Sequence, residues 1–337
     1  MQNPERMPLP RLILAPMEGL ADDVLREVLT STRAYDWCVT EFLRVTGTLL
    51  PHSLYRRMSP ELMQASRTAS GTAIRVQLLG ADPAMMAQNA AHLARLRPAG
   101  IDLNFGCPAP LVNRHRGGAA LLGEPELLHA IVSQVRAAVP AEIPVSAKMR
   151  LGIADTARAL ECALALEAGG AESLVVHART KTDGYKPPAR WEWLARIRAQ
   201  VRLPLIANGE VWTVQDYLDI RAVSGCDDVM LGRGAVADPL LATRIRAALS
   251  EQPEAADPAQ EWQTLCELIA RFWLRVNCKL APQHTPGRLK QWLGLMRRAY
   301  PQAEVLYAEL RPLRHADAIS PVLRRHGIAV ADTRAAA

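Results

Sequence analysis

The sequence lacks paired cysteines and long apolar runs. Its six cysteines, spread over 337 residues, include no Cys-x-x-Cys pair and no metal-ligand spacing. We therefore expect reduced thiols, as in a cytoplasmic protein, and no metal centre. The first ten residues contain charges and three prolines but not the apolar core of a signal peptide. No run of 18 apolar residues is present, so we expect no membrane-spanning segment.

Positive charge is confined to one end of the chain. Residues 1–261 carry 28 basic and 29 acidic side chains, whereas residues 262–337 carry 12 basic and 5 acidic ones. A solvated charged surface would not need to gather its cations in one segment. The segregation favours an acidic partner such as a nucleic acid, bound by the C-terminal quarter.

Eight short apolar runs alternate with helical patterns through the first 250 residues. No Gly-x-Gly-x-x-Gly motif follows the first run, which counts against a doubly wound dinucleotide-binding sheet, the other fold with this alternation. Several runs are apolar along most of their length, as parallel strands buried on both faces are. We therefore predict an α/β fold, a (β/α)8 TIM barrel, over residues 1–250. The expected strands are Leu12–Met17, Trp37–Phe42, Ala73–Leu79, Ile101–Phe105, Pro144–Met149, Ser173–Ala178, Pro204–Asn208 and Asp228–Gly232.

Helical periods lie between most of these strands. Two of them begin with an Asp-Pro pair, at Asp82 and at Asp238, which predicts an N-cap followed by a proline in the first turn. The connection from Leu43 to Thr72 is longer than usual and basic, so we consider it a candidate binding loop. The expected helices are Asp22–Leu29, Pro83–Arg95, Pro125–Ala138, Thr156–Ala168, Trp191–Gln200, Val214–Val223 and Pro239–Leu249.

The pattern changes after residue 250. A polar stretch with two prolines reads as a linker, and only helical patterns follow it, over about 259–278, 286–300, 301–310 and 317–326. We expect a small helical domain over residues 259–337. Because it holds the excess positive charge, it is the predicted nucleic-acid-binding domain.

Polar residues stand at nearly every predicted strand end. In a barrel of this type the active site forms at the C-terminal ends of the strands, so these residues should line one pocket. The strand-end groups are Pro16-Met17-Glu18, Glu41, Gln77, Asn104 with Cys107, Lys148 with Arg150, His177 with Arg179, Asn208-Gly209-Glu210 and Gly232-Arg233-Gly234.

Cys107 is the candidate reactive group. A single cysteine is most often buried and inert. Here it lies between Gly106 and Pro108, just past the strand that ends at Phe105, and therefore on a loop. The polar, basic segment that follows, residues 113–118, is also typical of a functional loop.

The last two strand ends predict an anion site. Glycines at Gly209 and Gly232 would let backbone N–H groups approach a phosphate, and Arg233 can add charge. A helix beginning near Ala235 would direct its positive end there. Lys148 ends a buried strand, where an unpaired ammonium is costly, so an electron-rich ligand ring would stabilise it.

Several motifs together resemble the tRNA-dihydrouridine synthase family. They are Ala15-Pro16-Met17-Glu18-Gly19, Asp102-Leu103-Asn104-Phe105-Gly106-Cys107-Pro108, Lys148-Met149-Arg150, His177-Ala178-Arg179-Thr180-Lys181, Asn208-Gly209-Glu210 and Gly232-Arg233-Gly234. The resemblance runs from about residue 11 to residue 311. Segments at residues 40–45, 65–68 and 288–293 are similar to the DusC subfamily, which acts on uridine 16 of tRNA.

The resemblance implies a flavin enzyme that reduces uridine to 5,6-dihydrouridine in tRNA, with FMN as cofactor and NADPH as electron donor. Cys107 would be the general acid. The implied FMN contacts are Pro16, Met17, Glu18, Gln77, Lys148, His177, Asn208, Gly209, Glu210, Gly232 and Arg233. The implied contacts to the base and the tRNA are Arg44, Asn104, Arg179, Tyr185, Arg288, Lys290 and Arg311. We expect a monomer.

The loop after Cys107 departs from the family pattern. It reads Asn113-Arg114-His115-Arg116-Gly117-Gly118, where relatives tend to have small residues and glycine.

The sequence leaves two alternative functions open. A flavin enzyme for a small molecule, of the dihydroorotate or dihydropyrimidine type, would share the barrel but need no basic helical domain. A non-catalytic RNA-binding protein would leave Cys107 and Lys148 without a role.

Overall fold

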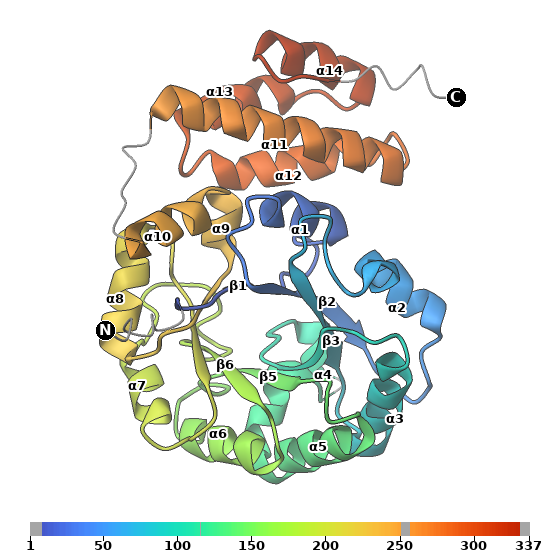
Figure 1. The fold of residues 1–337 in the computed structure, drawn as a ribbon, viewed down its shortest axis with the longest axis vertical. Helices are drawn as coiled ribbons and strands as arrows, with labels where there is room; N and C mark the ends of the chain where they lie inside the picture. The colour runs from blue at the N-terminus through green and yellow to red at the C-terminus, as the bar shows by residue number, and fades with distance from the viewer. Residues whose placement is uncertain (1–8, 115, 251–256, 331–337) are drawn as a thin grey trace, which may run out of the picture.

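The computed structural model describes residues 9–114, 116–250 and 257–330, in which eight parallel strands close into a barrel. Each strand pairs with its neighbours in sequence, and β1 also pairs with β8 (Figure 1). All eight predicted strands, and the (β/α)8 fold, are confirmed. The strands are β1 Leu12–Leu14, β2 Trp37–Arg44, β3 Ala73–Leu79, β4 Gly100–Phe105, β5 Val145–Arg150, β6 Ser173–His177, β7 Leu205–Asn208 and β8 Val229–Leu231.

Alternation along the strands separates two layers of packing. Ile13, Val39, Val175 and Ile206 form a small apolar cluster that is distinct from the large core. Leu12 and Leu14, on the opposite face of β1, belong to the larger core that includes the surrounding helices. Strands buried on both faces explain why the runs are apolar rather than alternating.

Helices surround the barrel, and the predicted ones are present with small shifts at their ends. The Asp82 carboxylate caps α3 by accepting from the Met85 N–H, as predicted. The helix predicted from Pro239 begins at Leu241, and the Asp238 carboxylate accepts from the Leu240 N–H at 3.1 Å, as the Asp-Pro signal indicates. The helices of the barrel are α1 Asp23–Thr30, α2 His52–Met58, α3 Pro83–Ala94, α4 Pro110–Arg114, α5 Pro125–Ala138, α6 Ala159–Ala168, α7 Glu192–Arg198, α8 Val214–Ser224, α9 Arg233–Ala237 and α10 Leu241–Leu249.

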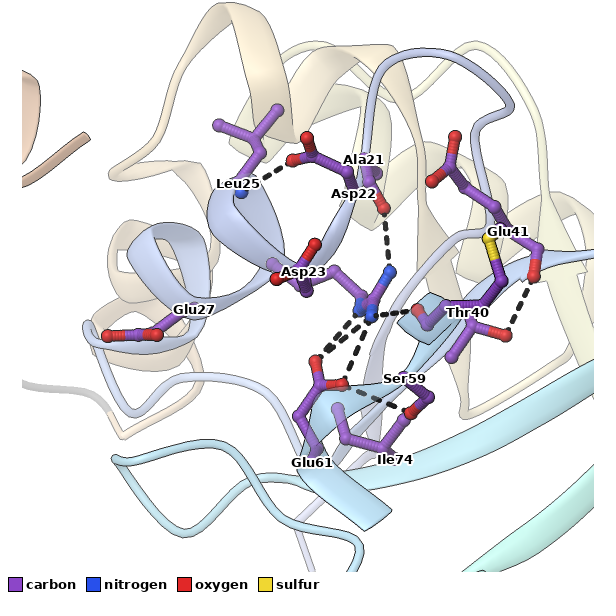
Figure 2. A network of polar contacts seen from close by, with 12 residues as sticks. Ala21, Asp22, Asp23, Leu25, Glu27, Thr40, Glu41, Ser59, Glu61 and Ile74 are labelled. Carbon is purple, nitrogen blue, oxygen red and sulfur yellow. Dashed lines mark hydrogen bonds and ion pairs between the residues drawn. The ribbon is translucent and has the colours of Figure 1, made fainter. Parts of the chain in front are cut away.

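The long connection between β2 and β3 is folded onto α1. It contains α2 and a 3-10 helix, Pro60–Gln64, and it is anchored by Glu61. The Glu61 carboxylate accepts hydrogen bonds from Arg26 of α1 at 3.0 Å and from Ser59 at 3.0 Å. All three residues are buried. The Arg26 guanidinium also donates to the carbonyl of Ala21, just before α1, at 3.0 Å; Figure 2 shows Ala21 on one side of this network and Glu61 with Ser59 on the other. This buried ion pair fixes the segment against the barrel; its role as a binding loop stays a prediction.

Four helices are described after the barrel, and the first two of them pack over α1 and α9 (Figure 1). Trp292, fully buried, donates its indole N–H to the Val236 carbonyl at 3.0 Å and contacts the Phe272 ring edge-on. Residues 251–256 of the predicted linker lie outside the described residues, and the division into two domains stays a prediction. The four helices are α11 Pro258–Lys279, α12 Thr285–Met296, α13 Pro301–Leu310 and α14 Ala316–Arg325. Among the helices described, none is long and apolar enough to cross a membrane.

Candidate active site

One cavity of about 300 Å³ opens at the C-terminal ends of the barrel strands. Its volume lies at the lower end of the range of small-ligand sites. All eleven predicted flavin contacts line it, as do Asn104, Cys107, Arg179 and Tyr185. Four other predicted tRNA contacts, Arg44, Arg288, Lys290 and Arg311, are not among the residues that line it. The structure therefore brings together residues from all eight strand ends, as the barrel predicts.

Cys107 lies on the wall of this cavity, held by backbone hydrogen bonds. Its N–H donates to the Asn104 side-chain oxygen at 2.9 Å, and its carbonyl accepts from the Ala119 N–H at 3.0 Å. Gly118 approaches so closely, with φ +61°, that an added Cβ would be 2.8 Å from the Cys107 carbonyl oxygen. Burial raises the pKa of the thiol, and the negative charge of Glu18 adds to this effect. Cys107 is therefore protonated at neutral pH and able to donate a proton.

The loop after Cys107 is tied back to it despite its unusual sequence. The Asn113 side-chain N–H donates to the Cys107 carbonyl at 2.9 Å and to the Ala109 carbonyl at 2.8 Å. Arg116 forms an exposed ion pair with Glu124. His115 of this loop lies outside the described residues. Asn113 therefore stabilises the loop through these two bonds, a role that the sequence alone did not indicate.

Lys148 is a half-buried cation with one side-chain partner among the described residues. Its ammonium donates to the Asn208 side-chain oxygen at 3.1 Å. Asn208 is itself oriented, because its side-chain N–H donates to the Met230 carbonyl at 2.8 Å. Burial lowers the pKa of Lys148 to about 8, and the nearby Arg150 contributes. An electron-rich ligand in the cavity would stabilise the charged form.

His177 is held neutral beside Arg179. Burial, together with the positive charges of Arg150, Lys148 and other neighbours, lowers the pKa of His177 well below its ordinary value. The Arg179 guanidinium lies 3.3 Å from the His177 Nε2. Since a guanidinium only donates, Nε2 accepts and the proton sits on Nδ1. Arg179 also pairs with Glu210 and is 1% exposed, so it forms part of the wall.

Trp212, which sequence reasoning left unassigned, stands at the rim together with Arg298, one of the cations of the predicted tRNA-binding region. Trp212 lines the cavity, and the Arg298 guanidinium, from the helical region, lies 4.1 Å from its ring centroid. Arg233 lies over the same ring at 5.4 Å and over the Tyr185 ring at 4.5 Å. This layering of cations and rings joins the barrel mouth to the helical region. A tryptophan four residues after the end of β7 was the available signal for it.

Arg150 is a second residue that sequence reasoning left unassigned, and it is buried below the rim. It donates to the carbonyls of Gly106 at 2.9 Å, Thr180 at 2.9 Å and Gly184 at 2.8 Å. These bonds tie the loop of Cys107 to the loop after β6. The sequence placed Arg150 at a strand end but indicated no role for it.

The residues present fit a flavin mononucleotide by their chemistry. Gly209 has a φ of +124°, and a Cβ there would lie 2.9 Å from the His177 ring, so only glycine fits at this position of the cavity lining. Arg233 and Lys148 supply positive charge for a phosphate and for the electron-rich edge of a ring. Within the described residues, no group of three His, Cys, Asp or Glu could hold a metal ion, and the expected absence of a metal stays a prediction.

Two predicted tRNA contacts have partners within the chain. Arg288 donates to the Leu20 carbonyl at 3.1 Å and pairs with Asp22 at 3.0 Å. Lys290 donates to the carbonyls of Arg311, at 3.1 Å, and Leu313. Both side chains thus have a structural function in the described part of the chain, whether or not they also meet tRNA.

Known proteins resemble this chain over almost its whole length. The chain is 56% identical over 319 residues to the tRNA-dihydrouridine(16) synthase of Ralstonia nicotianae, covering 95% of this chain and 96% of that protein. It is 48% identical over 316 residues to the enzyme of the same name from Neisseria meningitidis serogroup B, covering 93% of each.

Solved structures with little sequence identity share the fold. A histamine dehydrogenase from Rhizobium sp. 4-9 matches with a TM-score of 0.54 and 13% identity, over 78% of this chain and 48% of that one. At this identity the likeness shows the fold alone. The family model described as "Dihydrouridine synthase (Dus)" matches residues 13–286, which is most of the chain. Together with the curated relatives, this match shows that the chain belongs to the dihydrouridine synthase family.

Proposed function

We propose that this protein reduces uridine to 5,6-dihydrouridine in tRNA, at position 16, with a bound flavin. Family membership supports the reaction, and the similarity to tRNA-dihydrouridine(16) synthases supports the position. The observation that carries the proposal is the shared cavity of Cys107 and Lys148, a proton donor and a half-buried cation at the same strand ends. An RNA-binding protein without catalysis would need neither.

The proposed cofactor is FMN, with NADPH as electron donor. Bound in the cavity, reduced FMN would supply a hydride for C6 of the uracil ring. Lys148 and Asn208 would hold its ring through the ammonium and the oriented amide. Gly209, Gly232 and Arg233 line the same cavity and would bind the phosphate. The other proposed contacts are Pro16, Met17, Glu18, Gln77, His177 and Glu210.

Cys107 would complete the reduction with a proton. Hydride addition at C6 leaves negative charge on C5 and the adjacent carbonyl, and the thiol S–H would protonate C5, leaving a thiolate. The raised pKa of Cys107 keeps this proton in place until charge develops. Asn104, Arg179 and Tyr185 would bind the base, which must leave its stack to enter the cavity.

The helical region, residues 259–337, would hold the tRNA outside the barrel. Its net charge is positive, and Arg298 brings a cation to the cavity rim. Arg44, Arg311 and the partly paired Arg288 and Lys290 are further proposed contacts. A monomer in the cytoplasm, with no metal, is part of the same proposal.

Mapping dihydrouridine in tRNA from cells lacking this protein tests the proposal directly. We expect loss of dihydrouridine at position 16 alone, and its return when the gene is restored. Unchanged modification would overturn the proposal. The purified protein should be yellow from bound FMN, which a non-catalytic RNA-binding protein would not be. Turnover of free uracil or dihydroorotate without tRNA would favour a small-molecule flavin enzyme instead.

A further inference from the structure

A continuous line of hydrogen bonds runs beneath the cavity to the loop of Cys107. The Asp102 carboxylate accepts from the Gln77 side-chain N–H at 2.7 Å, and the Gln77 side-chain oxygen accepts from the Asn104 side-chain N–H at 2.8 Å. The Asn104 side-chain oxygen then accepts from the backbone N–H groups of Gly106, at 3.0 Å, and Cys107, at 2.9 Å. Asp102 is not among the residues that line the cavity.

The strands explain why these groups meet. Asp102 and Asn104 are two residues apart on β4 and therefore lie on the same face of the strand. Gln77 of β3 is in register with Asp102, as is Ser146 of β5 on the other side. The Ser146 hydroxyl donates to the second Asp102 carboxylate oxygen at 2.6 Å. Gln77 and Asp102 are 0% and 1% exposed, so water does not compete for these bonds.

The carboxylate determines the direction of every bond in this line. An ionised carboxylate can only accept, so Gln77 must turn its side-chain N–H toward Asp102. Its oxygen is then left for Asn104, which must turn its own N–H toward Gln77 and its oxygen toward the loop. With Asn104 reversed, its N–H would face the donors of Gly106 and Cys107, and its oxygen would face the Gln77 oxygen. With Gln77 reversed, its oxygen would face the Asp102 carboxylate, so in either case buried polar groups would lose their partners.

Burial opposes the charge of Asp102, and its polar neighbours favour it; the pKa of the carboxyl group is raised overall. Burial raises the pKa of this carboxyl group, and the hydrogen bonds from Gln77 and Ser146, with the positive charges of Arg75 and Lys148, act in the opposite direction. Arg75, Lys148 and the two donors all approach from β3 and β5, the strands that flank β4.

We propose that Asp102 is a positioning residue: by accepting from Gln77 it fixes the orientation of both amides and so holds the loop that carries Cys107. The role of that loop rests on the proposed function, whereas the polarity of the line does not. A proton donor that is displaced by about 1 Å can lose much of its rate, so the geometry of this loop matters to the reaction.

Exchanging the acceptor and donor ends of the line tests the proposal. Asn104→Asp alone sets two acceptors against Gln77, whereas Asp102→Asn/Asn104→Asp lets residue 102 donate to Gln77, which then donates to residue 104. Carboxylate 104 would still accept from the Gly106 and Cys107 N–H groups. The second pair of variants, Gln77→Glu and Asp102→Asn/Gln77→Glu, makes the same test at the contact between residues 77 and 102. The single variant sets two carboxylates against each other there, and the double variant restores a donor at residue 102. Ser146→Ala is the control, because it removes a bond to Asp102 without changing the direction of the line.

The readouts use the full-length, flavin-loaded protein with Cys278→Ser, since Cys278 is an exposed thiol. Asn104→Asp and Gln77→Glu should each lower the Tm by about 2–4 °C or more. Each should also change the rate of Cys107 alkylation by iodoacetamide by about fivefold or more. Asp102→Asn in the same chain should recover at least half of each loss, although it removes a native group.

Recovery of both readouts in either double variant supports the proposal, and so does a double variant that folds where its single variant does not. Additive losses in both double variants, or Ser146→Ala changing the alkylation rate as much as Asn104→Asp, would overturn it. Failure of the wild-type protein to form dihydrouridine would refute the proposed function, but it would leave these two readouts and their interpretation unaffected.

Discussion

The Arg288 guanidinium in α12 lies 3.0 Å from the carboxylate of Asp22, the residue that caps the N-terminus of α1. Two further cations of the helical region, Arg275 and Lys279, pair with Glu27 and Asp23 of α1. These three acidic side chains are drawn in Figure 2. Part of the positive charge that the sequence assigns to tRNA binding therefore joins the helical region to the barrel. The net charge of a segment is an upper limit on what remains for phosphates.

Replacing Arg288 by Ala should destabilise the protein. The change removes the partner of Asp22 and the donor to the Leu20 carbonyl, at a site where the Arg288 side chain is 17% exposed, so we expect a loss of about 1–3 kcal/mol in the free energy of unfolding. Urea denaturation of the flavin-loaded protein measures it. The exposed Arg271 of α11 is the control, and Arg271→Ala should cost less than about 0.5 kcal/mol. A variant of unchanged stability that binds tRNA weakly would instead make Arg288 a direct contact.

The affinity for FMN should fall as the pH rises above about 8. The pKa of Lys148 is lowered to about 8 in the empty site, and an anionic or electron-rich ligand favours its charged form. Binding therefore takes up a proton above this pH, and each further pH unit costs about tenfold in affinity until the complex itself titrates. Flavin fluorescence titrations from pH 6.5 to 9.5 measure this slope.

Lys148→Met is the matched variant for this pH dependence. It keeps the length of the side chain but removes the ammonium, so we expect weaker binding with little change across the same pH range. A wild-type affinity that is flat from pH 7 to 9.5, or a slope that persists in the variant, would show that Lys148 does not hold the flavin by its charge.

Cys107→Ala should separate the two half-reactions. The variant should still bind FMN and accept electrons from NADPH, because the thiol is not required for either step. Dihydrouridine formation on tRNA should fall by about 10²–10⁴-fold, the usual contribution of a general acid. Stopped-flow absorbance at 450 nm follows flavin reduction, and mass spectrometry of the tRNA gives the product. The control is Cys278→Ala, at an exposed thiol, which should change neither flavin reduction nor product formation. Near-normal product formation by Cys107→Ala would show that Cys107 is not the general acid.

The pattern of apolar runs and strand-end residues was sufficient to predict the fold and the residues that line the cavity. Strands in a parallel barrel are buried on both faces, so their apolar runs stand out, and the strand ends converge by topology alone. Cys107 and Lys148 could be placed in one pocket for this reason, before any contact was known.

The sequence did not indicate the side-chain contacts that depend on packing between distant segments. Arg288 meets Asp22 across 266 positions, and nothing in either local sequence indicates the pair. The direction of the bonds between Asp102, Gln77 and Asn104 likewise follows from strand register and burial, which motifs do not encode.

Arg298 should contribute directly to tRNA binding. Its guanidinium covers Trp212 at the cavity rim at 4.1 Å, and the described residues show no ion pair for it. Reversing its charge with Arg298→Glu should weaken tRNA binding and reduce the slope of log affinity against log salt by about 0.7–0.9, the effect of one lost phosphate contact. NADPH-driven flavin reduction should be unchanged. Filter binding between 50 and 300 mM KCl measures both quantities.

Arg325→Glu gives the matching change of charge at a site away from the cavity lining. Arg325 pairs with Glu309 at 3.0 Å within the helical region, so its reversal alters net charge equally without touching the rim. If long-range charge alone attracted tRNA, the two reversals would weaken binding alike. We expect the larger loss for Arg298→Glu, because a contact at the rim acts within one Debye length of the phosphates. Equal and small effects would direct attention to the basic segment from Arg44 to Arg67 as the surface that holds tRNA.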